Sequence, residues 1–195
     1  MPHVNSADSV LVVIDAQDGF YPPARTDVDH DEKNAALDRV GWVCGLAVAI
    51  DVPVVVTEED PGNKGPTAPQ VRRHLRTSTP VFDKHVFGAA DQPDIRDAVE
   101  RTGRGVVVLV GMETDVCVAH SALGFSEQGC RVVVIHDAAF SAGPAHSHGL
   151  TRLRQEGVEL ISAKELYYEW LRDLATVRAF DAAHPDLRSP PGFPL

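Results

Sequence analysis

The hydrophobic pattern along the chain consists of short apolar runs separated by longer amphipathic segments. Four of the runs are continuous, and two further runs are weaker. Strands that are covered by helices on both faces need apolar side chains on both faces, so they lose the period-two pattern of half-exposed strands. The pattern therefore predicts six strands, the strong ones at residues 10–14, 53–57, 106–110 and 132–135 and the weak ones at 80–82 and 158–161.

The segments between these runs have the length and the spacing of apolar residues that helices need. They predict helices over Lys33–Ile50, Asp91–Thr102, Val116–Gln128, Ala145–Glu156, and Ala163 to about Phe180. Asp91 is the expected N-cap of the second helix, with Asp94 in its first turn, and Gly103 and Gly129 stand where helices commonly end. The alternation of strands and helices predicts a parallel, doubly wound sheet with right-handed crossovers, which is a three-layer α/β/α fold.

Two long loops and a tail interrupt this alternation. Residues 21–31 and 58–69 contain prolines and charged residues, and each loop leaves the carboxyl end of a strand, where open α/β sheets form their sites. The tail, residues 184–195, has four prolines in twelve residues and cannot continue a helix. We expect one domain over residues 1–183 and a Pro-rich tail that is either disordered or laid over a neighbouring subunit.

The composition excludes several functional classes. Of the 195 residues, 44% are hydrophobic and 24% are charged, as in soluble globular proteins. The net charge of −10 argues against a nucleic-acid partner or an anionic membrane, because both need a basic surface. Cys44, Cys117 and Cys130 are an odd number without CxxC spacing, which favours reduced thiols. With no signal-peptide pattern and no apolar run of about 20 residues, the expected location is cytoplasmic.

Cys117 lies where a nucleophile would be expected. The strongly apolar run at 106–110 is followed by Gly111 and then by an Ala- and Leu-rich segment, so the thiol falls on a sharp strand-to-helix turn. Unpaired backbone N–H groups and the positive end of the helix dipole favour a thiolate at such a position. The alternative interpretation is a buried free cysteine that acts as a small hydrophobic residue.

Asp15 and Lys84 each follow an apolar run directly. Taken alone, Asp15 could cap the following loop, and Lys84 could be a solvated surface charge. Together with Cys117, however, they place an acid, an ammonium and a thiol at the same edge of one parallel sheet. A free thiol has a pKa of roughly 8.5, so a carboxylate that takes its proton and an ammonium that holds the thiolate would activate it.

Three segments of the chain resemble motifs of the cysteine hydrolases of the isochorismatase-like superfamily. Residues 13–20 contain the D-x-Q-x-x-F pattern, residues 82–88 match the lysine segment, and residues 111–118 match G-x-x-T-x-x-C-V. Asp137-Ala138, after the fifth predicted strand, also fits. The resemblance extends from about Val10 to Trp170. The superfamily includes nicotinamidases, N-carbamoylsarcosine amidases and ureidoacrylate amidases.

The resemblance implies a fold and a set of catalytic residues. The implied sheet has the strand order 3-2-1-4-5-6, and the implied triad carries over to Asp15, Lys84 and Cys117. A non-proline cis peptide is implied at Met112-Glu113, with the backbone N–H groups of Glu113 and Cys117 forming an oxyanion hole.

The resemblance also bears on the pocket and on metal binding. Phe20 and Phe87 are the expected apolar walls, His120 is expected at the rim, and Gln17 and Glu58 complete the predicted pocket. The D-x-H-x-x-x-H metal motif of nicotinamidases is absent, because the equivalent stretch, residues 57–63, contains no histidine. Its acidic residues would hold a hard cation only weakly, so neither metal nor cofactor is expected.

The leading hypothesis is a metal-independent cysteine hydrolase that cleaves a small amide-like C–N bond through a thioester intermediate. Its partners would be a small-molecule substrate and copies of itself, as a homodimer or a higher homo-oligomer. One alternative is an isochorismatase-type hydrolase in which Asp15 is the general acid and the thiol is incidental. Another is a non-catalytic binding member of the same fold. A dinucleotide-binding domain is disfavoured because no G-x-G-x-x-G follows a strand.

Overall fold

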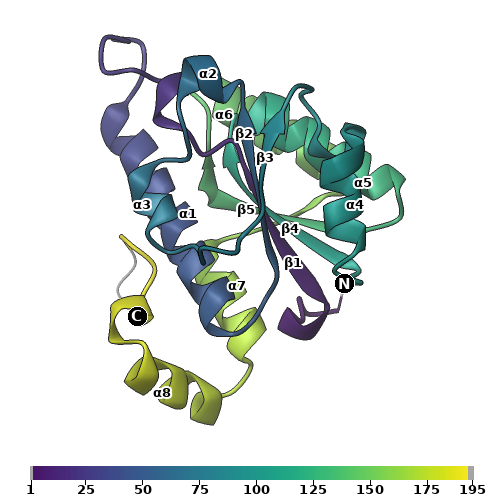
Figure 1. The fold of residues 1–195 in the computed structure, drawn as a ribbon. Helices are drawn as coiled ribbons and strands as arrows, with labels where there is room; N and C mark the ends of the chain where they lie inside the picture. Colours follow the sequence, from purple (N-terminus) through teal and green to yellow (C-terminus); the bar gives the residue numbers. More distant parts are fainter. Residues whose placement is uncertain (1, 193–195) are drawn as a thin grey trace.

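The centre of the protein is a six-stranded parallel sheet with the strand order β3-β2-β1-β4-β5-β6 (Figure 1). The structure is a computed structural model, and it describes residues 2–192. The strands are β1 (Ser9–Ile14), β2 (Val54–Glu59), β3 (Val81–Lys84), β4 (Val106–Met112), β5 (Arg131–Phe140) and β6 (Glu159–Ile161). The predicted fold class and strand order are therefore confirmed, including both weak strands.

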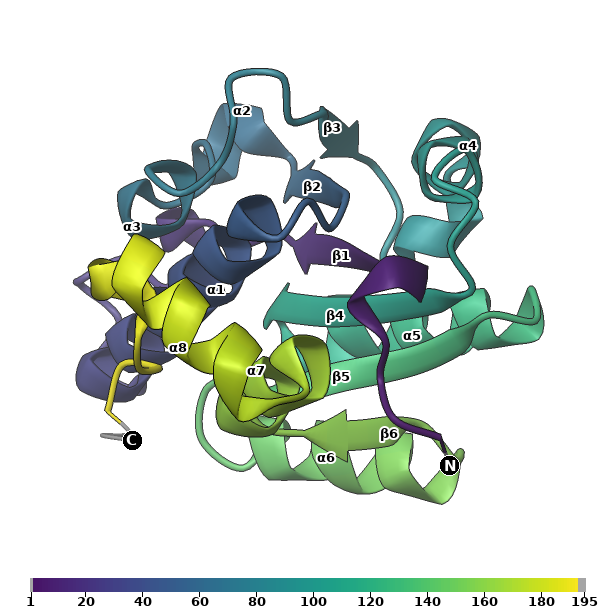
Figure 2. The same ribbon diagram turned by 90° about the horizontal axis from the view of Figure 1, so that it is seen from below.

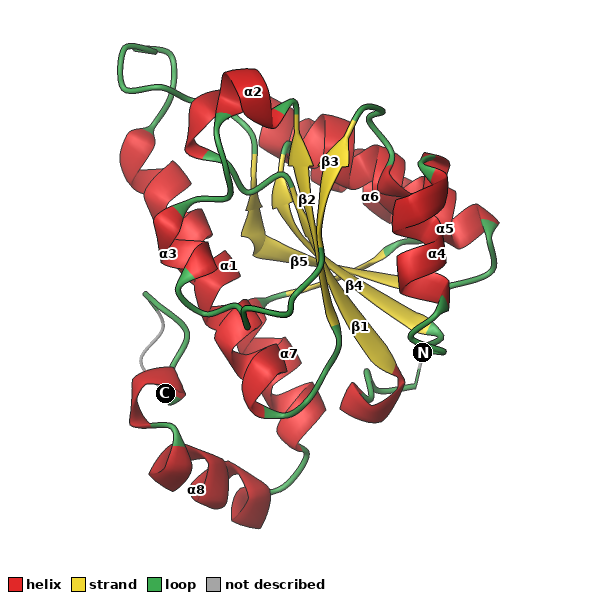
Figure 3. Ribbon diagram, viewed as in Figure 1, coloured by secondary structure: helices red, strands yellow, loops and turns green. Residues whose placement is uncertain are grey.

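Helices cover both faces of this sheet, as Figures 2 and 3 show. The α-helices are α1 (His30–Ala49), α2 (Pro61–Lys64), α3 (Pro69–Arg72), α4 (Pro93–Glu100), α5 (Ala119–Glu127), α6 (Ala145–Gln155), α7 (Ala163–Leu171) and α8 (Leu174–Ala183). Short 3-10 helices span Ser6–Asp8, Asp18–Phe20, Ala89–Asp91 and Pro185–Leu187. None of the helices within residues 2–192 is both long and apolar enough to cross a membrane.

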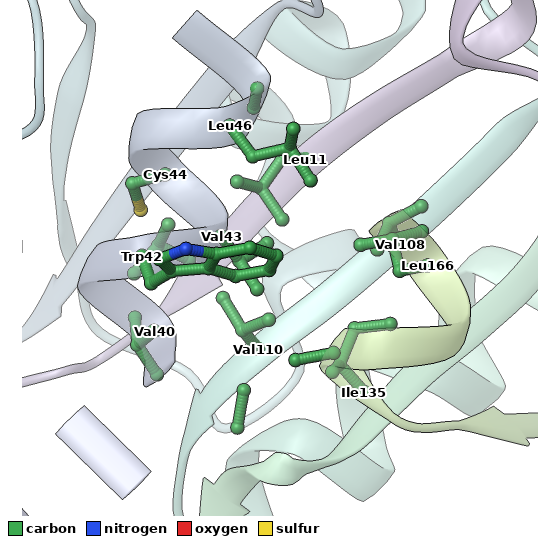
Figure 4. Packing of buried hydrophobic residues seen from close by; sticks show 14 of the residues in the cluster. Leu11, Val40, Trp42, Val43, Cys44, Leu46, Val108, Val110, Ile135 and Leu166 are labelled. Atoms are coloured by element: carbon green, nitrogen blue, oxygen red, sulfur yellow. The ribbon is translucent and has the colours of Figure 1, made fainter. Parts of the chain in front are cut away.

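Alternate residues of each central strand belong to two different cores, one on each face of the sheet. In β1, Leu11 and Val13 pack with α1 and α7, whereas Val10 and Val12 pack with α4, α5 and α6. Figure 4 shows the first of these cores, where Trp42 of α1 lies among side chains from β1 and β4. Burial on both faces is the physical reason that these strands are continuous apolar runs in the sequence.

Two helix starts differ from their predictions. The first helix begins at His30, three residues early, because the Asp29 carboxylate accepts hydrogen bonds from the N–H groups of Asp31 and Glu32. Asp91 is not an N-cap: it ends a 3-10 helix, and α4 begins after Gln92 with Pro93, whose fixed φ suits the first helical position.

Two predicted segment lengths were wrong. The segment from Ala163 to Phe180 is two helices, because Arg172 has a φ of +70° and Asp173 caps α8. The fifth strand continues to Phe140, so Asp137 and Ala138 lie within β5 and not after it.

The described part of the C-terminal tail, residues 184–192, packs on α1 of the same chain. The indole N–H of Trp42 donates to the carbonyl of Leu187 at 3.1 Å, and the guanidinium of Arg39 donates to the carbonyl of Pro191 at 3.2 Å. We had expected a tail that is either disordered or laid over a neighbouring subunit; residues 184–192 instead pack on their own chain. Residues 193–195 lie outside the described part of the chain.

The carboxyl ends of β1 and β4 approach each other closely at Gly111. This glycine has a φ of +119°, and a Cβ placed on it would lie 1.9 Å from the carbonyl oxygen of Ile14. Only glycine fits a backbone conformation of this kind with a neighbouring main chain so near. The close approach matters because Asp15 and the turn that carries Cys117 follow directly from these two strand ends.

We predict that Gly111→Ala lowers the free energy of unfolding by about 3 kcal/mol or more, since it combines a forbidden φ with a backbone clash. Gly103→Ala is the matched control: Gly103 also has a positive φ, +66°, but nothing lies within 4 Å of its Cβ position. The control should lose only about 1 kcal/mol. Urea unfolding of both variants measures the difference, and equal losses would contradict the close approach.

Candidate active site

Asp15 is held rigidly at the end of β1 by Thr57 of β2. The Asp15 N–H lies within hydrogen-bond distance of both the carbonyl and the hydroxyl oxygen of Thr57, at 3.1 and 3.2 Å, and the Thr57 hydroxyl donates to Asp15 Oδ1 at 2.6 Å. Asp15 has a φ of +45° and no exposed surface. These contacts leave Oδ2 directed at Lys84, whose Nζ lies 3.0 Å away.

Lys84, the last residue of β3, is also fully buried. Besides its ion pair with Asp15, its ammonium donates to the carbonyl oxygens of Val86 at 2.6 Å and Phe87 at 3.3 Å. Asp15 Oδ2 has no hydrogen-bond partner of good geometry among the described residues, so only the ion pair with Lys84 engages it. Its proton-accepting capacity is therefore only partly used.

Cys117 lies in one turn of π-helix, Thr114–Val118, between β4 and α5. The predicted helix from Val116 thus begins as a wider turn, in which the Glu113 carbonyl accepts from the N–H groups of Val116 and Val118. The peptide bond between Met112 and Glu113 is cis. The thiol sulfur lies 3.6 Å from Lys84 Nζ.

Neighbouring elements fix the position of this turn. The Ser121 hydroxyl donates to the Cys117 carbonyl at 2.6 Å and accepts from the Ala89 N–H at 2.9 Å, which ties the turn to the segment after Lys84. On the other side, α6 packs so closely that a Cβ on Gly149 would lie 2.7 Å from the backbone of Asp115. The structure therefore brings Asp15, Lys84 and Cys117 together.

Glu59 is a second carboxylate beside the thiol, and the sequence motifs did not predict it. The Cys117 thiol donates to Glu59 Oε2 at 3.0 Å, and Lys84 Nζ lies 3.3 Å from the same oxygen. The other oxygen, Oε1, is paired with Lys64. Glu59 is the last residue of β2, so the strand-end argument that identified Asp15 and Lys84 applied to it as well.

Two of the predicted pocket residues, Glu58 and Gln17, bind parts of the loop after β2. Glu58 points away from the thiol, where its carboxylate accepts from the N–H and the hydroxyl of Thr67, both at 2.6 Å. Gln17 holds the loop after β2 in place: its side-chain amide exchanges hydrogen bonds with the backbone of Glu59 and donates to the Gly65 carbonyl at 2.6 Å. Neither side chain lies against Cys117.

A cavity of about 250 Å³ opens beside the site, lined by Glu59, Asp60, Lys84, His85, Val86 and Phe87. The Phe87 ring is 57% exposed and packs edge-on against His120, with their centroids 6.1 Å apart. Phe20 lies elsewhere, with Lys64 Nζ 3.9 Å from the centre of its ring. Phe87 thus lines this cavity with His120 beside it, whereas Phe20 supports the Lys64–Glu59 pair.

The pKa of the Cys117 thiol is raised above its ordinary value. Burial raises the pKa of this thiol, the charges of Asp15 and Glu59 raise it further, and Lys84 lowers it only in part. Burial likewise raises the pKa of the Asp15 carboxyl, against the opposing effect of Lys84. Desolvation therefore outweighs the helix-start effect that led us to expect a thiolate.

The pKa values of Glu59 and Lys84 are shifted in the directions that favour their charged forms. Burial opposes the charge of Glu59, but hydrogen bonds from Lys64 and the Cys117 thiol, together with Lys84, hold the pKa of its carboxyl below the usual value. For Lys84, burial is outweighed by the attraction of Asp15, Cys117 and Glu59, so the pKa of the ammonium is raised.

Asp15, Glu59 and Cys117 each offer a donor atom that could bind a metal ion, and the three atoms lie within 4.8 Å of one another. The ammonium of Lys84 lies 3.0, 3.3 and 3.6 Å from these side chains, so it already supplies the positive charge at their centre. A metal ion at this point would be repelled by Lys84.

The family of the chain follows from comparison with known proteins. The model of the isochorismatase domain matches residues 9–165, which is most of the chain. The chain belongs to the isochorismatase family. It is 28% identical over 189 residues to the probable hydrolase YcaC of Escherichia coli, covering 93% of this chain and 89% of YcaC. It is also 30% identical over 194 residues to the secreted isochorismatase effector Isc1 of Phytophthora sojae, covering 97% of this chain and 83% of Isc1.

Solved structures of isochorismatase-family proteins share this fold. The crystal structure of E. coli YcaC, described as an octameric hydrolase of unknown specificity, superposes with a TM-score of 0.80 and 25% identity, covering 96% of this chain and 94% of that one. YcaC from Pseudomonas aeruginosa, solved with hexane-2,5-diol and covalent acrylamide, superposes with a TM-score of 0.79 and 23% identity, covering 95% and 93%. The chain is thus a hydrolase of the isochorismatase family.

Because burial raises the pKa of Cys117, we predict that its alkylation by acrylamide accelerates roughly tenfold per pH unit between about pH 7 and 9, without a plateau. Peptide mapping by mass spectrometry separates Cys117 from Cys130 and from Cys44, the pKa of which burial raises to about 12. Glutathione, an unperturbed thiol, is the reference. A plateau for Cys117 below pH 8 would show a resting thiolate and contradict this assignment.

Proposed function

We propose that this isochorismatase-family member is a metal-independent cysteine hydrolase that cleaves a small amide-like C–N bond. The observation that carries the proposal is the buried ammonium of Lys84, which lies 3.0 Å from Asp15 Oδ2 and 3.6 Å from Cys117 Sγ. A carboxylate, an ammonium and a thiol at these distances can transfer a proton and stabilise the resulting thiolate.

In the proposed mechanism, Asp15 accepts the proton of Cys117, and Lys84 stabilises the thiolate. The raised pKa of Asp15 favours this transfer, because it makes the carboxylate a stronger base. The thiolate attacks the substrate carbonyl carbon, and the backbone N–H groups of Glu113 and Cys117 would stabilise the oxyanion. The amine leaves with the proton from Asp15.

The second half of the proposed reaction regenerates the enzyme. A water molecule gives a proton to Asp15 and attacks the thioester. When the tetrahedral intermediate collapses, the carboxylic acid leaves, and the sulfur of Cys117 recovers a proton from Asp15. This scheme requires a substrate carbonyl group that can acylate the sulfur of Cys117. It therefore favours cleavage of a C–N bond over cleavage of a vinyl ether.

We predict that Cys117→Ala abolishes turnover, with a loss of at least about a thousand-fold in kcat/KM, while the melting temperature changes little. The measurement is a screen over small amides, hydroxamates and ureido acids with ammonia release as the readout. Cys130→Ala is the matched control, because Cys130 is a half-buried thiol outside the site, and it should retain full activity.

The same screen tests the mechanism against its alternatives. Release of pyruvate from isochorismate by the Cys117→Ala variant would replace the cysteine mechanism with general-acid catalysis by Asp15. Intact mass spectrometry after substrate addition should detect the thioester on the wild-type protein. Activity retained by Cys117→Ala on an amide would overturn the proposal.

We also propose that the protein forms a homo-oligomer, in line with the octamer described for E. coli YcaC. Size-exclusion chromatography with light scattering measures the assembly directly, and a monomer at micromolar concentration would contradict it. The cytoplasmic location remains a prediction from the sequence.

A further inference from the structure

The cavity beside the site is lined by acidic, basic and apolar residues, with Lys84 and His85 among them. Glu59 and Asp60 contribute carboxylates to its wall, and the segment Val86–Phe87 forms another part of it. The carbonyl oxygens of this segment face the Lys84 ammonium, at 2.6 and 3.3 Å from Nζ. A substrate group that enters the cavity therefore meets the negative charges of Glu59 and Asp60.

Lys84 is poorly placed to bind an anionic substrate group, although it lines the same cavity. Its side chain has no exposed surface. Five acceptors surround its three N–H groups, namely Asp15 Oδ2, Glu59 Oε2, Cys117 Sγ and the carbonyl oxygens of Val86 and Phe87. The charge of Lys84 is thus already met by acceptors of the protein itself.

The charges around the cavity leave an excess of negative charge. Lys64 pairs with the far oxygen of Glu59 and lies over the Phe20 ring, away from the cavity wall. The three carboxyl groups of Asp15, Glu59 and Asp60 thus stand against two ammonium groups, those of Lys64 and Lys84, and His85 also lines the cavity. The carboxylate of Asp60 is exposed, and the hydrogen bond that it accepts from Asn63, at 2.7 Å, comes from a neutral amide.

We propose that the site selects a cationic substrate: a small amide that carries an ammonium or guanidinium group next to the scissile carbonyl. Glu59 and Asp60 provide the counter-charge, and the exposed ring of Phe87 provides a face for a cation. The inference rests on the proposed function, because it assigns the substrate class of the same cysteine.

Such a substrate would also activate the nucleophile. In the free protein, the Cys117 thiol donates to Glu59 Oε2 at 3.0 Å. A cation bound at this oxygen replaces the thiol as its partner and places positive charge beside the sulfur. Both changes favour the thiolate, so the nucleophile forms when the substrate is bound.

Three methanethiosulfonate reagents test the charge preference without knowledge of the substrate. They transfer a 2-(trimethylammonio)ethylthio, a 2-sulfonatoethylthio or a neutral methylthio group. In each case the Cys117 thiolate attacks the divalent sulfur of the reagent, a disulfide forms, the bond to the sulfonyl sulfur breaks and methanesulfinate leaves. All rates are measured on the Cys130→Ala protein and divided by the rate of the same reagent with 2-mercaptoethanol, which removes intrinsic differences in reactivity.

We expect Cys117 to react about tenfold or more faster with the cationic than with the anionic reagent. Asp60→Asn should reduce this ratio about threefold, since it removes a charge that does not touch the sulfur, and asparagine tolerates the positive φ of 45° at this position. Glu59→Gln should reduce the cationic-to-anionic ratio further. The rate with the neutral reagent shows separately how this substitution changes the reactivity of the thiol. Asp83→Asn, which removes an exposed charge from the neighbouring strand β3, is the matched control and should leave the ratio unchanged.

The outcomes separate this inference from the proposed function. If the neutral reagent modifies Cys117 but the charge ratio is one or below, the cationic class is wrong and the cysteine mechanism stands. If the neutral reagent does not modify Cys117 in folded protein, the nucleophile itself is refuted. If Asp83→Asn lowers the ratio as much as Asp60→Asn does, the ratio reflects net charge, and the inference is overturned. If Glu59→Gln fails to fold, the comparison of Asp60→Asn with Asp83→Asn decides, because only a local counter-charge makes the first substitution lower the ratio more than the second.

Discussion

The burial of one ammonium group, that of Lys84, is the interaction on which the rest of the site depends. A buried charge without a partner costs several kcal/mol, so this lysine is tolerated only where acceptors surround it. Asp15 comes from the end of β1, Glu59 from the end of β2, and Cys117 from the turn after β4. The ammonium therefore links four separate strand ends, since Lys84 itself ends β3.

The order of the strands makes this convergence possible. In the order β3-β2-β1-β4, the four strands that supply the charged groups and the thiol are neighbours, and all are parallel. The crevice at the carboxyl end of β1 and β4 is the switch point at which open α/β sheets bind ligands. Gly111 allows the two strand ends to meet, and Thr57 then directs the Asp15 carboxylate toward Lys84.

Two effects compete for the ionisation of Cys117. The start of a helix stabilises a negative charge by about 0.3–1 kcal/mol, whereas burial can shift a pKa by several units. Two carboxylates near the sulfur add to the effect of burial. The pKa of the thiol is therefore raised, and formation of the reactive thiolate depends on the raised pKa of Asp15 and on what occupies the cavity.

The sequence by itself determined the strands, the fold class and the positions of Asp15, Lys84 and Cys117 at strand ends. Its continuous apolar runs have one physical cause, burial on both faces of a parallel sheet, and a polar residue directly after such a run must lie at the sheet edge. The motif resemblance added the strand order, which the structure confirms. The strands and the strand-end positions follow from local pattern, whereas the strand order came from the resemblance.

Only the tertiary structure decided which acidic residue faces the thiol. Glu58, Glu59 and Asp60 are consecutive, and alternation along β2 sends Glu58 to Thr67 and Glu59 to Cys117. The loop that supports Glu59 is held by Gln17 and Lys64, from different parts of the chain. Packing also decided the break at Arg172 and the path of the tail over α1. Contacts between segments distant in sequence set these features, and no local pattern records such contacts.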